Sequence, residues 1–216
     1  HESDNHVYSV RLNRTKGTLD EVFTVQPLDV GKSLNESLYA ETRSVVYASA
    51  TLAVDGQFDA FERAVGFNEG GDSQADVLKV DSSFDFDANM RVYVPSDMPE
   101  PQDPAYLPTL ESFLIDLHRA QHGSMLTLFT NRREMEQCFD EVHPALKEDD
   151  LRLVCQKWGV SVKGLRDDFL KDEHLSLFAL KSFWEGFDAP GATLKGVVIP
   201  KLPFGLPTDP LSCERQ

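Results

Sequence analysis

The chain has 216 residues, with 21 basic and 36 acidic side chains and therefore a formal net charge of −15. A charge of this sign argues against a protein that coats nucleic acid with its whole surface. The acidic excess lies mainly in residues 1–120, so we expect any anionic ligand to meet residues 121–216. Three cysteines without a C-x-x-C pair exclude a disulfide framework and a four-cysteine cluster, and they favour a reducing, cytoplasmic setting. No apolar run approaches about 18 residues and no signal-peptide pattern is found, so we expect no membrane contact.

The first 90 residues combine short apolar runs with helical spacing. The first two apolar runs flank a turn-rich segment, which predicts a hairpin that leads into the domain over residues 1–28. An acidic, Ser/Asp-rich segment closes this part and is predicted to be a loop. In chain order, the predicted elements are strands at 6–12 and 21–26, a helix at 29–38, a strand at 44–48, a helix at 58–65 and a loop at 66–90.

The remaining residues carry four continuous apolar runs, which are typical of strands covered on both faces in a parallel sheet. Segments with helical spacing separate these runs and predict crossover helices. The predicted elements are a strand at 91–95, a helix at 106–121, strands at 125–129, 151–155, 175–180 and 196–200, and helices at about 131–146 and 163–171. We therefore expect a single α/β domain with a mostly parallel central sheet and helices on both faces.

Two short polar segments follow predicted strands, where open parallel sheets present their ligands. In residues 48–52, the hydroxyls of Ser49 and Thr51 flank the small Ala50 and could bridge phosphate-linked groups, although a Ser/Thr turn explains the same residues. In residues 129–135, Thr130 or Asn131 would begin a helix with free backbone N–H groups, and Arg132 would follow in its first turn. A phosphate site is expected there, with a capped helix carrying solvated arginines as the alternative.

A third segment, residues 181–210, follows the predicted strand at 175–180. It places aromatic residues and the carboxylates of Glu185 and Asp188 among glycines that include Gly186. Such a combination predicts a site, with an aromatic plug at the end of the sheet as the alternative. Lys181 and Lys201 supply positive charge in the same stretch.

The sequence gives little indication of a metal site or of a catalytic nucleophile. His118 and His122 have the i, i+4 spacing of a metal pair but no third ligand, so we interpret them as cap and dipole residues in the last turn of a helix. A phosphate loop, a nucleophile elbow and a catalytic cysteine–histidine set are all missing from the sequence.

In order and spacing, the three segments resemble motifs III, IV and V of the second RecA-like motor domain of DinG/XPD-type superfamily 2 helicases, in particular the bacterial DinG branch. The resemblance runs from about residue 25 to the end of the chain and is most specific in residues 183–210. It implies a RecA-like fold over residues 1–216, within a larger DNA-repair motor. It further implies ATP-driven translocation on single-stranded DNA, in the 5′-to-3′ direction.

The resemblance also implies roles for individual residues. Glu185, Gly186 and Asp188 would face ATP, and Ser49, Ala50 and Thr51 would couple the two ligands. DNA would be held by the following residues: Thr130, Asn131, Arg132, Lys181, Trp184 and Lys201. ATP and Mg²⁺ would be bound mainly by an upstream RecA-like domain of the same protein, which in many members also carries an iron–sulfur cluster.

A different class of protein stays open from the sequence. The net charge of −15 and the incomplete ATP site suit a non-catalytic module that keeps the motor fold and only docks on nucleic acid or protein.

Overall fold

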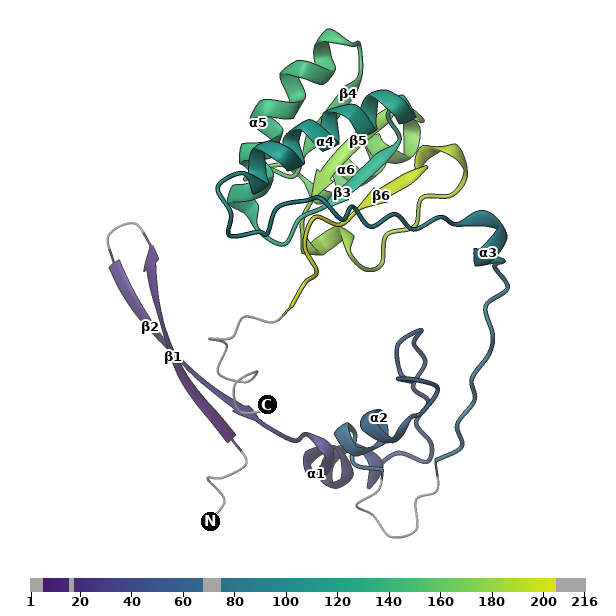
Figure 1. Ribbon diagram of the computed structural model, residues 1–216. Coiled ribbons are helices and arrows are strands. Elements are labelled where there is room, and N and C mark those ends of the chain that lie inside the picture. Colours follow the sequence, from purple (N-terminus) through teal and green to yellow (C-terminus); the bar gives the residue numbers. More distant parts are fainter. Residues whose placement is uncertain (1–5, 16–17, 68–74, 205–216) are drawn as a thin grey trace. The chain divides into compact units, whose positions relative to one another are not determined.

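The computed structural model describes residues 6–15, 18–67 and 75–204. These residues belong to two compact units, one within residues 1–91 and one formed by residues 92–204 (Figure 1). The expectation of one domain over residues 1–216 stays a prediction. No helix in the described part of the chain is long and apolar enough to cross a bilayer.

The second unit is a layered α/β structure in which helices cover both faces of a sheet (Figure 1). Each predicted strand and helix between residues 106 and 200 is present, with boundaries shifted by at most two residues. In chain order the elements are α4 (Tyr106–Gln121), β3 (Met125–Leu128), α5 (Arg132–Glu148), β4 (Arg152–Cys155), α6 (Val162–Lys171), β5 (Leu175–Ala179), the 3-10 helices η3 (Lys181–Phe183) and η4 (Gly191–Thr193), and β6 (Gly196–Val198).

The four strands form a parallel sheet in the order β4-β5-β3-β6. Leu177 of the central β5 lies opposite Leu126 of β3 on one side and opposite Val154 of β4 on the other. All residues of β3 and β5 are buried, as expected for parallel strands with both faces covered. The predicted α/β fold class is therefore confirmed.

Alternation along β5 divides the core into two layers. Phe178 points into a cluster that α4 and α5 close, and it contacts Phe129 with ring centroids 5.2 Å apart. Leu177 and Ala179 point to the other face, where Phe169 of α6 packs on them. One strand thus anchors helices on both sides of the sheet, because its side chains alternate between the faces.

The stripe that anchors α4 has a spacing of four residues and consists of Tyr106, Leu110, Leu114 and His118, all buried. The helix ends at His122 in the left-handed conformation, followed by Gly123 at φ +88°. A Cβ at Gly123 would collide with the backbone of His174, so only glycine fits this close approach.

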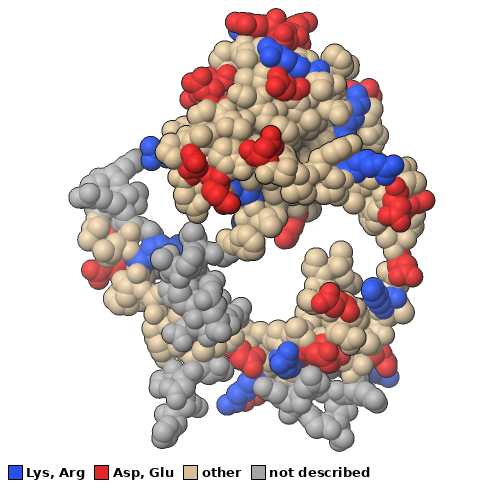
Figure 2. All heavy atoms as spheres, in the orientation of Figure 1, with Lys and Arg blue, Asp and Glu red and all other residues tan. Residues whose placement is uncertain are grey.

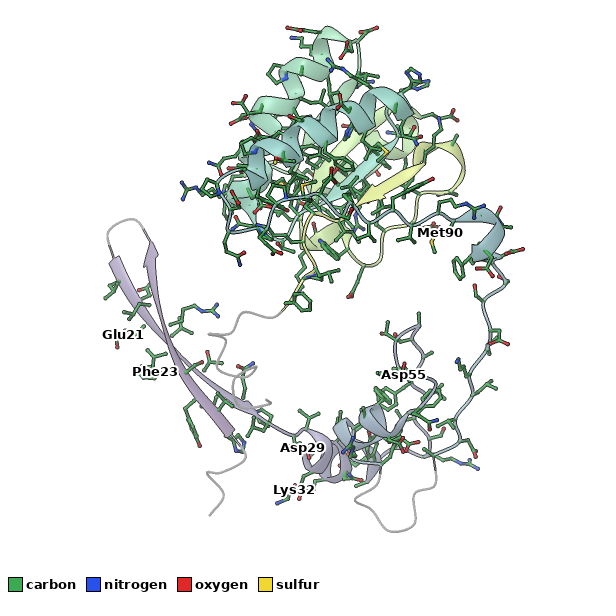
Figure 3. The ribbon with its side chains drawn as sticks, in the orientation of Figure 1. Glu21, Phe23, Asp29, Lys32, Asp55 and Met90 are labelled. Atoms are coloured by element: carbon green, nitrogen blue, oxygen red, sulfur yellow. The ribbon has the colours of Figure 1, made fainter. Side chains whose placement is uncertain are left out.

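The first unit contains a two-stranded antiparallel sheet and short helices. Val10 of the first strand lies opposite Phe23 of the second, and both side chains are exposed; Figure 3 labels Phe23. The two strands predicted at 6–12 and 21–26 are present and longer than expected. The elements are β1 (His6–Thr15), β2 (Thr18–Pro27), α1 (Gly31–Leu34), the π-helix η2 (Asn35–Tyr39), α2 (Asp59–Ala64) and α3 (Phe86–Asn89).

A small aromatic cluster organises residues 29–67. Tyr47 packs edge-on against Phe61 and Phe67, and the Tyr39 hydroxyl donates to the Val65 carbonyl at 2.9 Å. The carboxylate of Asp29, labelled in Figure 3, accepts a 2.7 Å hydrogen bond from the Gly31 backbone. Asp29 thus forms a turn just before α1, whose N-cap residue is Val30.

Two predicted strands do not form. Residues 44–48 and 91–95 have no regular structure, and Val46 is 88% exposed. Within the described ranges, neither segment pairs with another strand. A β-branched run needs a partner strand and a covered face before it becomes a stable strand, so propensity alone gave the wrong prediction.

Candidate functional site

All four strands of the parallel sheet end at one edge, which we call the carboxyl edge. β3 leads there into residues 129–135, and β5 leads into the loop 181–188. β4 leads into Gln156, and β6 leads into Lys201. The parallel order therefore brings two of the three predicted segments to neighbouring strands, at the edge where open α/β sheets bind ligands (Figure 1).

Asn131 begins α5 as its N-cap. Its side-chain oxygen accepts hydrogen bonds from the backbone of Arg133 at 2.8 Å and of Glu134 at 3.4 Å. The predicted cap is confirmed, but it occupies N–H groups that a phosphate would use. Thr130 and Asn131 are exposed and Arg132 is half-buried, so an anion reaching this helix start would meet side chains first.

Gln156 joins the helix start to the loop 181–188. Its backbone carbonyl accepts a hydrogen bond of 2.7 Å from Nη1 of Arg132. Its side-chain oxygen accepts from the Leu180 backbone at 2.8 Å, and its Nε2 donates to the Ser182 hydroxyl at 2.9 Å. With only 8% of its surface exposed, this one residue ties the two segments together through three hydrogen bonds.

The loop 181–188 divides into an apolar and a polar side. Phe183 is buried and Phe187 packs against it, with ring centroids 5.2 Å apart, as part of the core layer of α6. Lys181, Glu185, Gly186 and Asp188 are exposed. The aromatic plug and the polar surface therefore coexist, and the phenylalanines fix the loop that presents the charged residues.

Arg166 of α6 holds the same loop from the other side. Its guanidinium donates to the Ser182 carbonyl at 2.6 Å and to the Gly186 carbonyl at 3.5 Å, and it lies 5.2 Å from the centroid of the Phe183 ring. Neither Gln156 nor Arg166 was identified from the sequence. The available signal was the position of Gln156 directly after an apolar strand; Arg166 sits in an ordinary amphipathic helix and gave none.

Lys201 is less available than the sequence suggested. Its ammonium pairs with the carboxylate of Glu134 and lies 4.8 Å from the centroid of the Tyr106 ring, and both charged side chains are largely covered. Burial, followed by the Glu134 charge, raises the pKa of Tyr106 to about 12. The Lys201 charge is thus already neutralised within the fold, and its assignment to DNA stays a prediction.

Trp184 packs partly against the apolar layer of α6 rather than standing free.

The first predicted segment lies in the other unit. Ser49, Ala50 and Thr51 belong to the unit within residues 1–91, whereas the other two segments belong to the unit of residues 92–204. There the Ser49 hydroxyl accepts a 3.2 Å hydrogen bond from the Thr51 backbone, which is the Ser/Thr turn given as the alternative. Their coupling role stays a prediction, and the part of the third segment from residue 205 onward lies outside the described residues.

His118 does not act on the helix dipole as predicted. It is buried, its Nδ1 donates to the Leu114 carbonyl at 2.6 Å, and burial lowers its pKa, so the ring is a neutral core residue. His122 takes the predicted place at the helix end.

Burial raises the pKa values of the Cys138 and Cys155 thiols, that of Cys155 to about 12, so both thiols stay protonated. The described ranges hold no group of three or more potential metal ligands.

Basic and acidic side chains are intermingled on the face of the second unit seen in Figure 2. No patch of basic residues alone is evident in this view. A cavity of about 320 Å³ lies at the opposite edge of the sheet, where Arg152 begins β4 and Leu175 begins β5. The two segments at the carboxyl edge, residues 129–135 and the loop 181–188, are therefore away from this cavity.

Comparison with known proteins gives this arrangement a context. Residues 114–216 match the helicase C-terminal domain family. The chain is 32% identical over 195 residues to ATP-dependent DNA helicase DinG of Photobacterium profundum, covering 89% of this chain and 28% of the relative. It is 30% identical over 190 residues to 3′-5′ exonuclease DinG of Bacillus subtilis, covering 86% and 20%. It is 30% identical over 186 residues to ATP-dependent DNA helicase YoaA of Escherichia coli, covering 86% and 28%. The chain thus spans about a quarter of the length of these curated relatives.

Proposed function

We propose that this chain forms the second motor domain of an ATP-dependent DNA helicase. The premise is that the chain belongs to the DinG-type helicases through the C-terminal domain at residues 114–216. In this proposal the complete protein couples ATP hydrolysis to 5′-to-3′ movement along single-stranded DNA. Glu185, Gly186 and Asp188 face the nucleotide, and residues 130–132 with Lys181 hold the DNA backbone. Relatives named as ATP-dependent DNA helicases support the proposal.

The observation that carries this function is the hydrogen-bonded position of Gln156. Its contacts with Arg132, Leu180 and Ser182 join the proposed DNA segment to the loop that carries the nucleotide-facing residues. Movement of the loop 181–188 on ATP binding would therefore pull on the start of α5. A rigid link between two ligand sites is what coupling of hydrolysis to translocation requires.

The chain's own residues supply only part of this chemistry. ATP brings the phosphates to be cleaved, and Mg²⁺ would neutralise their charge. The described residues hold no cluster that fits a resident Mg²⁺ or an iron–sulfur cluster, and the two described cysteines keep protonated thiols. We propose that Mg²⁺ is held mainly by the upstream RecA-like domain, and we derive no step through Mg²⁺ or an iron–sulfur cluster from this chain.

The test uses the complete helicase with Asp188→Ala and Lys181→Ala. Asp188→Ala should slow ATP hydrolysis and abolish unwinding, with the affinity for single-stranded DNA kept within about threefold. Lys181→Ala should weaken DNA binding and reduce its salt dependence by about one phosphate contact, while basal hydrolysis survives. Lys181 is a sharper choice than Lys201 because Lys201 is paired with Glu134.

Asp168→Ala is the matched control, since Asp168 is an exposed aspartate of α6. Equal loss of hydrolysis and DNA binding in the Asp188 and Lys181 variants, together with a lowered melting temperature, would mean that the loop is only structural.

A docking module without motor activity is the second candidate. The net charge of −15 and the ion pairing of Lys201 and Arg132 with glutamates favour it, because few cations remain free to hold DNA. A complete protein that binds ATP and DNA but shows no DNA-stimulated hydrolysis would support this second function.

A further inference from the structure

An exposed tryptophan stands at the carboxyl edge. Trp158 lies in the turn between β4 and α6, where the Val160 backbone donates to the Lys157 carbonyl at 3.3 Å and Gly159 takes the left-handed conformation. Its side chain is 81% exposed. Among the described residues from 106 onward, Phe204 is the other highly exposed aromatic residue, at 83%, and the remaining exposed large apolar side chains are aliphatic. A large aromatic surface left in water at a ligand-binding edge calls for a partner.

The indole ring is held in place. The guanidinium of Arg132 lies 4.5 Å from the centroid of the Trp158 ring, within the range of a cation–π contact. Arg132 is itself fixed by its hydrogen bond to the Gln156 carbonyl and by an ion pair of 3.7 Å with Glu136. One side of the ring is therefore supported by a positioned cation, while most of the ring surface faces solvent.

We propose that Trp158, stacked on Arg132, is a platform for a base of single-stranded DNA. This inference rests on the proposed function, because Arg132 belongs to the segment assigned to the DNA backbone. A flat aromatic surface beside a guanidinium fits a nucleobase with its phosphate: the base stacks on the ring and the phosphate meets the cation. Arg133, the next residue of α5, is exposed and adds a second positive charge at the same helix start.

The structure separates this residue from the other tryptophan. Trp184 is one of the residues that the resemblance places on DNA, but it packs partly against the apolar layer of α6. Of the two tryptophans, both of which are described, only Trp158 combines high exposure with a guanidinium against its ring. Stacking on DNA is therefore assigned to Trp158, with Trp184 in a structural role.

The experiment uses the two tryptophans of the 216-residue chain as separate reporters. Trp184→Phe leaves the emission of Trp158, and Trp158→Phe leaves that of Trp184. Each variant is titrated at low salt with an oligothymidylate and with an abasic deoxyribose-phosphate oligomer of the same length. We expect the oligothymidylate to quench Trp158 at least twofold more than Trp184, and the abasic oligomer to quench neither.

Affinity gives an independent measure. Trp158→Ala should lower oligothymidylate affinity about 5- to 150-fold, the range that corresponds to 1–3 kcal/mol per stacked base. Trp158→Phe should stay close to the unmodified chain because it keeps an aromatic face. Abasic oligomer affinity should not change in either variant. Circular dichroism should show the same urea midpoint for Trp158→Ala, since the side chain is exposed.

Two results would overturn the inference in distinguishable ways. Oligothymidylate that binds without quenching Trp158, and equally well to Trp158→Ala, would leave the DNA site intact and make this ring a protein contact instead. Failure of both oligomers to bind the unmodified chain would remove the proposed DNA site, and the stacking platform with it.

Discussion

In the unit of residues 92–204, the apolar runs of β3 and β5 are buried on both faces, whereas β1 and β2 of the other unit leave Val10 and Phe23 exposed. Both regions have sequences that predict strands, and strands form in both. The difference lies in cover: helices close both faces of the four-stranded sheet. A two-stranded ribbon is marginal by itself, so its stability must come from contacts beyond its own hydrogen bonds.

The largest test of this comparison removes one phenylalanine from each region. Phe178→Ala should lower the free energy of unfolding by about 3–5 kcal/mol, because it empties a fully buried site between β5, α4 and α5. Phe23→Ala should change it by less than about 0.5 kcal/mol, since that ring is 73% exposed. Urea unfolding followed by circular dichroism measures both. Similar losses would show that the ribbon has a covered face after all.

A smaller effect is expected from the hydrogen bonds at the carboxyl edge. Gln156→Leu leaves the Leu180 N–H and the Ser182 hydroxyl without their partner and should cost about 1–3 kcal/mol. Under the proposed function, the same change in the complete protein should also reduce the stimulation of ATP hydrolysis by DNA more than the basal rate. Gln137→Leu, at an exposed position of α5, is the control. Equal behaviour of the two variants in urea unfolding and in DNA stimulation would remove the link between the segments.

Buried His118 gives the second unit a dependence on pH. Its pKa is lowered in the folded state, so the unfolded chain binds the proton more readily, and stability falls as pH drops below the unfolded value of about 6.5. The loss can reach about 1.4 kcal/mol per pH unit until the folded pKa is passed. Unfolding of the chain and of His118→Gln should be compared at pH 7.5 and 5.5. Parallel losses in the two proteins would contradict a neutral, buried His118.

The smallest differences are expected on the two surfaces. Lys32 and Glu36 of the first unit lie 4.0 Å apart, and Arg119 and Asp149 of the second lie 2.7 Å apart; all four are exposed. Double-mutant cycles should give about 0.2–1 kcal/mol for each pair and less at high salt. Lys32, a residue of α1, is labelled in Figure 3. A coupling well above 1 kcal/mol in one pair only would show that surface charge, as well as burial, separates the two regions.

Much of the second unit follows from the sequence alone. The spacing of Tyr106, Leu110 and Leu114 predicts α4 with its observed ends, and continuous apolar runs predict the parallel strands. The residues at 44–48 and 91–95 have the same local character but no partner strand within the described ranges. A strand pairs with residues that are distant in the sequence. A local pattern therefore predicts a strand but does not show whether a partner strand is present.

The candidate site divides in the same way. The ends of apolar strands located residues 130–132 and the loop 181–188, because parallel strands end at one edge. The contacts that decide whether a side chain is free to bind a ligand were not predictable, because they join distant residues. Lys201 and Glu134 are 67 positions apart in the sequence, and Gln156 and Ser182 are 26 apart. Trp158 was not predicted as a site residue because the residues around it match no binding motif. Its exposure is known only from the fold.

The strand order also determines when each strand of the sheet can pair during synthesis. β3 pairs with β5 and β6 but not with β4, although β4 is the next strand along the chain. During synthesis, β3 must therefore wait for about 50 further residues before its first neighbour exists, roughly 3–10 s at ordinary elongation rates. Leu126 and Leu128 of β3 pack in the core layer of α6, and that helix is complete only shortly before β5. The apolar residues of β3 therefore lack a partner strand until β5 has been translated.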